Sequence, residues 1–211
     1  MSTGRNQLSN KKKLLIVAIT FACILAFSVL ALYLLKKDEA PDFYLPEPSD
    51  GPFAPVDWGE DALSDPDYLA LGDRLTVYAD IPSFGRYPVT SDEDLALGNE
   101  VLLLYRVIES VRAGDAELYN SFFSDFYRRI AGEKEPFTAQ KLYDIEITYQ
   151  KTFEDDDAGV LSLYRVGYKI MDNNGTYRND IASDELRYVY FHVRNVSGRF
   201  EVYSMVYAKY N

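Results

Sequence analysis

The sequence predicts an α+β fold: an N-terminal transmembrane helix is followed by one domain in which helices pack on an antiparallel sheet. Three observations support this. An apolar run fills residues 14–35, helical spacing of apolar residues fills much of 92–131, and a period of two begins after Phe137. Helices that precede a run of antiparallel strands are typical of the α+β class.

The first element is the run from Leu14 to Leu35, 22 residues without a charge. About 20 apolar residues suffice to cross a bilayer as a helix. A cleaved signal peptide would be shorter and would end at a small-x-small site, whereas this run ends in Tyr33-Leu34-Leu35. A lipoprotein would use Cys23, but Thr20-Phe21-Ala22 fits a lipobox poorly. We therefore expect an uncleaved anchor, with the lipid bilayer as its partner.

Flanking charge predicts the orientation of this anchor. Arg5 and Lys11–Lys13 precede the run, and only Lys36 and Lys37 follow it. Positive charge stays on the cytoplasmic side. We expect residues 1–13 to be a cytoplasmic tail and residues 38–211 to lie outside the cell membrane.

Residues 36–65 are expected to be a linker. From residue 38 they contain nine acidic residues, five prolines and no basic residue, and such composition favours an extended, self-repelling chain. The aromatic residues Phe43, Tyr44, Phe53 and Trp58 are unusual in a spacer, and we expect some of them to dock on the domain. We therefore expect Trp58, the chain's only tryptophan, to lie in a segment docked on the domain, which we place at residues 66–211.

Charge and cysteine content limit the function. The chain carries a formal net charge of −11, and residues 38–211 carry 16 basic and 33 acidic side chains, a balance of −17. This negative net charge argues against a nucleic-acid partner, because nucleic-acid binding needs basic patches. Residues 38–211 contain no cysteine, so the domain relies on packing. Exported domains without cysteine are typical of Gram-positive bacteria.

The domain begins with a predicted short strand at Leu75–Ala79 and a helix at Leu95–Val111, where apolar residues recur at helical spacing. Gly114-Asp115 interrupts this pattern. Asp115 is expected to cap a second helix over Ala116–Ile130, which Gly132 ends.

Four strands follow. Residues 143–150 alternate apolar and polar side chains, and so do Val160–Met171, Leu186–Val196 and Arg199–Tyr210. Turns are expected at Asn174-Gly175 and Ser197-Gly198. On the last strand Tyr203, Tyr207 and Lys209 share a face with Glu201 and Met205, which suggests a contact patch if that face is open.

The stretch from Val111 to Tyr119, with Gly114-Asp115 at its centre and Phe122-Phe123-Ser124 after it, resembles the NTF2-like superfamily. There a Gly-Asp pair opens the second helix. The resemblance covers residues 92–211 and implies a cystatin-like α+β cone, with helices packed on a strongly curved antiparallel sheet. Residues 176–181 look like a stretch in exported proteins of Clostridia-like bacteria that have no assigned function.

Enzymes of this superfamily use a pocket on the concave sheet face, often with an Asp or His and a Tyr. The matching candidates here are His192, the only histidine, and Tyr188, Tyr190 and Arg194 on the same strand face. The alternative is an ordinary half-buried sheet face, which we favour because no carboxylate partner is placed beside the histidine.

No metal or other cofactor is predicted. Structural zinc needs about four Cys or His ligands, and His192 stands alone. Two acidic stretches, Glu154–Asp157 and Asp172–Gly175, are possible calcium loops, but both fall where turns are expected.

Three hypotheses follow. The first is a membrane-anchored, extracytoplasmic domain that binds a protein or a small ligand without catalysis. The second is a scaffold component of a conjugation or secretion machine, because an NTF2-like domain behind one transmembrane helix looks like VirB8-type scaffolds. The third is an enzyme that uses His192 in a pocket. The oligomeric state is not predicted.

Overall fold

The computed structural model describes residues 19–20, 47–49, 51–58, 61–90 and 97–207. The chain divides into two compact units, Met1–Phe43 and Tyr44–Asn211. The predicted span Leu14–Leu35 lies outside the described residues except for Ile19 and Thr20, which are helical. Among the residues described, no helix has the length and apolar character needed to cross a membrane.

The second unit is built on a six-stranded mixed sheet with the order β2-β1-β3-β4-β5-β6. The strands are β1 (Val77–Ile81), β2 (Gly85–Val89), β3 (Lys141–Asp155), β4 (Gly159–Met171), β5 (Arg187–Val196) and β6 (Arg199–Tyr207). The α+β class is confirmed, but the expectation of a wholly antiparallel sheet is wrong. Strand β1 runs parallel to β3, because the chain crosses one face of the sheet through helices before it returns in β3.

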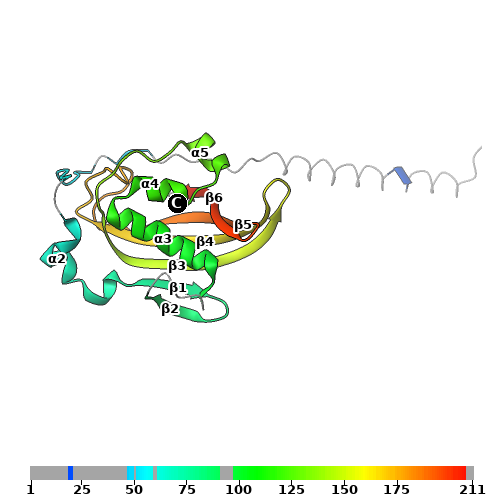
Figure 1. Ribbon diagram of the computed structural model, residues 1–211, viewed down its shortest axis with the longest axis horizontal. Helices are drawn as coiled ribbons and strands as arrows, with labels where there is room; N and C mark the ends of the chain where they lie inside the picture. Colours follow the sequence, from blue (N-terminus) through cyan, green and yellow to red (C-terminus); the bar gives the residue numbers. More distant parts are fainter. Residues whose placement is uncertain (1–18, 21–46, 50, 59–60, 91–96, 208–211) are drawn as a thin grey trace, which may run out of the picture. The chain divides into compact units, whose positions relative to one another are not determined.

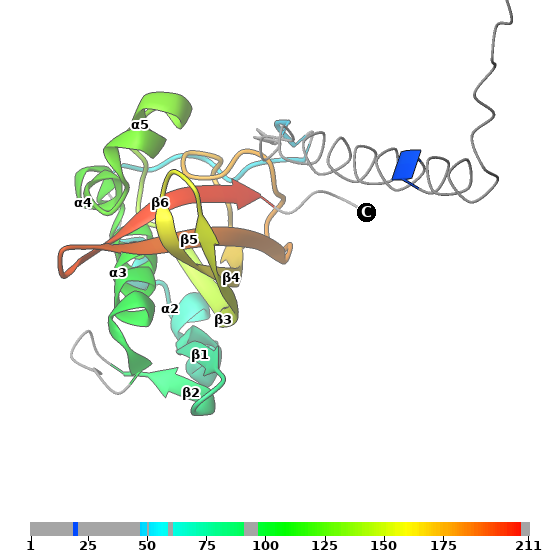
Figure 2. The same ribbon diagram turned by 90° about the vertical axis from the view of Figure 1, so that its right-hand side faces the viewer.

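Three helices make that crossover: α3 (Asn99–Ala113), α4 (Ala116–Ser121) and α5 (Asp125–Ala131). Figures 1 and 2 show all three on the same side of strands β3–β6. Shorter helical elements precede them, namely η1 (Ala62–Ser64), α2 (Pro66–Leu69) and η2 (Gly72–Leu75). The helices therefore cover one face of the sheet.

The predicted helix over Ala116–Ile130 is in fact two helices. Asp115 caps the first as expected, since its side chain accepts a hydrogen bond from the Leu118 amide at 2.8 Å. Between α4 and α5 the chain hydrogen-bonds to β6 instead: the Val202 amide donates to the Phe122 carbonyl, and the Ser124 amide donates to the Val202 carbonyl, both at 2.9 Å. Contact with a distant strand thus overrides the local helical pattern.

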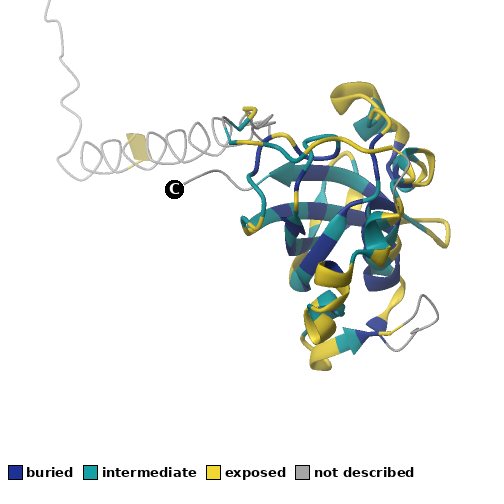
Figure 3. Ribbon diagram, turned by 90° about the vertical axis from the view of Figure 1, so that its left-hand side faces the viewer, coloured by how far each residue is buried: buried dark blue, intermediate teal, exposed yellow. Residues whose placement is uncertain are grey.

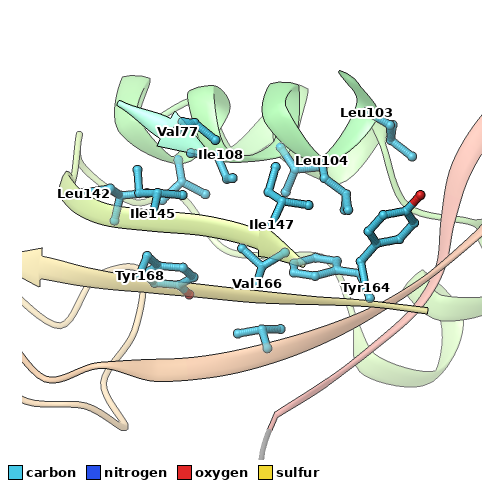
Figure 4. Packing of buried hydrophobic residues seen from close by; sticks show 14 of the residues in the cluster. Val77, Leu103, Leu104, Ile108, Leu142, Ile145, Ile147, Tyr164, Val166 and Tyr168 are labelled. Atoms are coloured by element: carbon cyan, nitrogen blue, oxygen red, sulfur yellow. The ribbon is translucent and has the colours of Figure 1, made fainter. Parts of the chain in front are cut away.

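The main core lies between α3 and the sheet (Figure 4). Strands β3 and β4 contribute Ile145, Ile147 and Val166, each at most 1% exposed, and α3 contributes Leu104 and Ile108. Alternation along the strands places these residues on the helix side. Each such buried side chain stabilises the fold by about 1.5–3 kcal/mol relative to exposure.

Aromatic rings fill the space beside α4. Tyr119 and Phe123 lie 4.8 Å apart between ring centroids, and Phe137 and Tyr177 lie 5.1 Å apart. All four rings are at most 5% exposed. The helix-facing side of the sheet is therefore largely filled by the protein's own side chains.

The described part of the predicted linker belongs to the second unit and hydrogen-bonds to the domain. The Ser49 amide donates to the Asn179 carbonyl at 2.6 Å, and the Ala54 amide donates to the Asn173 carbonyl at 2.9 Å. Of the four aromatic residues of this linker, Phe53 docks on the domain, because its ring lies 3.2 Å from where a Cβ on Gly175 would be, whereas Phe43 and Tyr44 lie outside the described residues. The expectation for Trp58 is wrong, because its side chain is 65% exposed.

Two glycines with positive φ provide a test of this packing. Gly114 (φ 71°) ends α3, and a Cβ there would lie 2.5 Å from the Ala139 amide nitrogen; Gly198 (φ 92°) has nothing within 4 Å. Both Ala variants carry the cost of a left-handed backbone, about 1–2 kcal/mol. We expect G114A to lose at least about 3 kcal/mol in urea unfolding because the clash adds to this cost. Equal losses in G114A and G198A would contradict the packing described.

Candidate functional site

Four candidate residues lie together on the outer face, which we define as the side of strands β3–β6 turned away from α3, α4 and α5. They are the partly exposed Tyr188, Tyr190, His192 and Arg194, which alternate along β5 with buried residues. Figure 3 shows this alternation of buried and half-buried positions along the strands. The structure therefore brings the predicted set together, away from the helix-covered core.

His192 has a hydroxyl and an aromatic ring as neighbours. Its Nδ1 lies 2.9 Å from Ser204 Oγ, and its ring meets Phe153 edge-on with centroids 5.9 Å apart. Burial lowers the pKa of His192 below its usual 6.5, and the positive charge of Lys151 lowers it further. The imidazole is thus neutral at pH 7, and no carboxylate in the described residues hydrogen-bonds to it.

Arg194 is neutralised within the sheet. Its Nη2 lies 2.8 Å from Glu201 Oε1, and its Nε donates to the same oxygen at 2.9 Å. Its guanidinium also lies 4.7 Å from the centre of the Tyr203 ring. Arg194 therefore holds the β5–β6 hairpin together and has little charge to offer a ligand.

Arg165 is a cation on the outer face that has no carboxylate partner among the described residues, as is Lys151 of β3. It lies on β4 directly opposite Tyr190, and its guanidinium carbon lies 4.6 Å from the centre of the Tyr188 ring. Its Nε is buried without a hydrogen-bond partner, and no carboxylate in the described chain pairs with it. The Nε atoms of Arg112, Arg128 and Arg187 are also buried without a hydrogen-bond partner, but those three guanidinium groups form ion pairs with carboxylates, and Arg165 does not.

Gly167 makes room for the ring on which Arg165 stacks. It pairs with Tyr188 across the strands, and a Cβ at Gly167 would lie 2.8 Å from Tyr188 Cε1. The ring therefore lies against the β4 backbone. Leu186, which is 42% exposed, approaches the same glycine, and Val206 lies opposite Tyr190 on β6.

We call this group the Tyr–Arg patch, defined by Arg165, Leu186, Tyr188, Tyr190 and Val206. Tyr and Arg are enriched in protein interfaces and among the residues that contribute most binding energy. A planar guanidinium held on a ring is suited to pair with a carboxylate through two hydrogen bonds. The patch can therefore bind an acidic group surrounded by apolar contacts.

The contact patch expected on the last strand does not form as predicted. A bulge between His192/Ser204 and Val193/Val202 changes the alternation. Tyr203 and Glu201 consequently meet Arg194, whereas Met205 and Tyr207 pack with the core. Lys209 lies outside the described residues.

The two acidic stretches serve as turns. Asp155 accepts hydrogen bonds from the amides of Asp157 and Ala158, at 3.0 and 2.8 Å. Asp172 pairs with Lys141 at 2.7 Å. Within the part of the chain that the structure covers, no three His, Cys, Asp or Glu residues are grouped to hold a metal ion.

Sequence reasoning missed Arg165. Alternation along Val160–Met171 already placed it on the polar side of its strand, opposite Tyr164 and Val166. Its position beside Tyr188 and Tyr190 depends on the β4–β5 register, which a single sequence does not reveal.

Comparisons of this chain with protein-family models, with curated proteins and with solved structures give no match. The resemblance to the NTF2-like superfamily therefore stays a prediction. The geometry of the Tyr–Arg patch is therefore the structural basis for a function.

The surroundings of His192 predict that its pKa is lowered in the folded chain. We expect a tag-free chain to give a single histidine signal by NMR with a pKa below 6.5, because burial and Lys151 disfavour the imidazolium. The unfolded chain then binds the proton more readily, so stability is lost as pH falls from about 6.5 through the folded-state pKa. A pKa above 6.5 would indicate an acidic partner and would favour an acid–base role.

Proposed function

We propose that this chain is a single-pass membrane protein whose extracytoplasmic domain binds a protein partner through the Tyr–Arg patch, without catalysis. Residues 14–35 anchor it, with the short N-terminus in the cytoplasm and residues 38–211 outside. The observation that carries the proposal is the Arg165 guanidinium, which is stacked on Tyr188 with a buried Nε that has no hydrogen-bond partner.

The shape of the patch supports a macromolecular partner. It is spread over three adjacent strands, β4, β5 and β6, and includes the exposed side chain of Leu186. Tyr and Arg are enriched in the surfaces of protein interfaces, whereas small ligands usually bind in clefts. A partner segment with a carboxylate next to apolar side chains would satisfy Arg165 and cover the tyrosines.

The distribution of charge on the domain favours binding of an acidic segment at this patch. Residues 66–211 carry 16 basic and 24 acidic side chains, a balance of −8, so most of the domain repels acidic ligands. Arg165 and Lys151 are local exceptions on the outer face, and Arg165 is the one stacked on an aromatic ring of the patch. An acidic partner group would therefore bind at this patch rather than elsewhere on the surface.

Two observations make the enzyme hypothesis weaker. His192 hydrogen-bonds to Ser204 rather than to a carboxylate. Aromatic rings, among them Tyr119, Phe123 and Tyr177, fill most of the space between the helices and the sheet, and the hollow that remains there is not lined by His192. Both features support binding as the role of the domain.

Site-specific photo-crosslinking in membranes of the source cells tests the proposal. Tyr190 is replaced by p-benzoylphenylalanine in the full chain, and the exposed Glu117 of α4 serves as the matched control position. We expect a discrete protein adduct at position 190 and none at position 117. R165E in the position-190 background should lower its yield at least about tenfold, because residues that dominate an interface contribute 2 kcal/mol or more.

The outcomes separate the hypotheses. An adduct with a second copy of the chain would favour the scaffold alternative over a distinct partner. The proposal fails if no adduct forms at position 190, or if R165E leaves the yield unchanged. R165K, which keeps the charge but not the planar fork, should give an intermediate yield.

A further inference from the structure

A small hollow of about 140 Å³ lies between α4, α5 and β6, on the helix side of the sheet. Its walls are mostly aromatic and apolar and include Tyr119, Phe123, Tyr127, Lys134, Met205 and Tyr207. It is separate from the Tyr–Arg patch, which lies on the outer face. An engineered apolar cavity of about 150 Å³ accommodates benzene, so this hollow is the right size for one small ring.

Lys134 is fixed in the wall of the hollow. Asn120 of α4 donates to the Lys134 carbonyl at 2.9 Å and accepts from the Lys134 amide at 2.8 Å. The ammonium lies 5.2 Å from the centre of the Tyr177 ring. The ammonium forms no ion pair or hydrogen bond with any other described residue, and the negative charge of Asp180 acts on it only from a distance, so it has no direct counter-charge.

The other charged residues of the hollow neutralise one another. Arg128 pairs with Glu133 at 3.3 Å and also with Asp125. These pairs leave Lys134 as the charge that a ligand would meet.

A second cation lies behind the wall. Arg178 is 3% exposed, and its guanidinium lies 4.4 Å from the centre of the Tyr207 ring. It hydrogen-bonds to Asp180 and to the Tyr168 hydroxyl. Burial lowers the pKa of Lys134, the charge of Arg178 lowers it further, and the charge of Asp180 partly opposes both. An anion in the hollow would offset both effects.

We propose that this hollow binds a small monocarboxylate with an aromatic or compact apolar body. The carboxylate pairs with the Lys134 ammonium, and the body packs on Tyr119, Tyr127 and Met205. The pairing supplies a direct ion-pair partner, which Lys134 lacks among the described residues, and the rings supply the apolar contacts. This site does not depend on the protein partner proposed above.

Thermal unfolding of the full chain in nanodiscs tests the site, with sodium benzoate as the probe. Benzamide has the same ring without the charge, and sodium acetate has the charge without the ring. We expect benzoate to raise the apparent Tm by about 3–5 °C at tenfold excess over its Kd. Benzamide and acetate should each raise it by less than about 1 °C.

Two variants locate the binding. K134M removes the ammonium charge but keeps the length of the side chain, and should abolish the benzoate shift. K151M removes an exposed lysine of β3 and should leave the shift unchanged. Saturation-transfer NMR between the protein and the benzoate ring measures binding independently of unfolding and should give the same ranking.

The proposal is overturned if benzoate gives no shift and no saturation transfer at tens of millimolar. Equal effects of benzoate and benzamide, or an equal loss of binding in K134M and K151M, would overturn it as well. Because the comparison of the three probes uses the unmodified chain, the test stands even if K134M folds poorly.

Discussion

The separation of core from surface in this domain depends on one constraint: helices cover only one face of its sheet. Helices α3, α4 and α5 all lie against the same face of strands β3–β6, so the period of two along each strand separates core from surface. Ile145, Ile147 and Val166 face the helices, whereas Arg165, Tyr188 and Tyr190 face away. A shift of one residue in any strand register would exchange the two sets.

This separation gives the tyrosines two roles. On the helix side Tyr119, Tyr168 and Tyr177 are buried and fill the core. On the outer face Tyr188 supports the guanidinium of Arg165. Arg165 and Lys134 lie on opposite sides of the sheet, and each lacks a carboxylate partner among the described residues. The two cations account for the two kinds of ligand proposed, an acidic protein segment and a small carboxylate.

Periodicity predicted much of the fold, because local spacing determines which elements form. The helix near residues 99–113 and the four long strands agree with it, and so does the shared face of His192 and its neighbours. Strand β2, the parallel β1–β3 pair and the break between α4 and α5 depend on contacts between distant residues. The importance of Arg165 follows from strand register, and the docking of Phe53 rather than Trp58 follows from the room at Gly175. A single sequence contains none of these facts.

The central claim is that the outer face is the part of the sheet left open for a partner. Hydroxyl-radical footprinting with mass spectrometry measures this directly, on the purified chain and on native membranes. The account predicts that Tyr188 and Tyr190 are modified in the purified chain and protected in native membranes, while Tyr168 and Tyr177 are protected in both. Equal modification of Tyr190 in the two preparations, or rapid modification of Tyr168 in the purified chain, would contradict it.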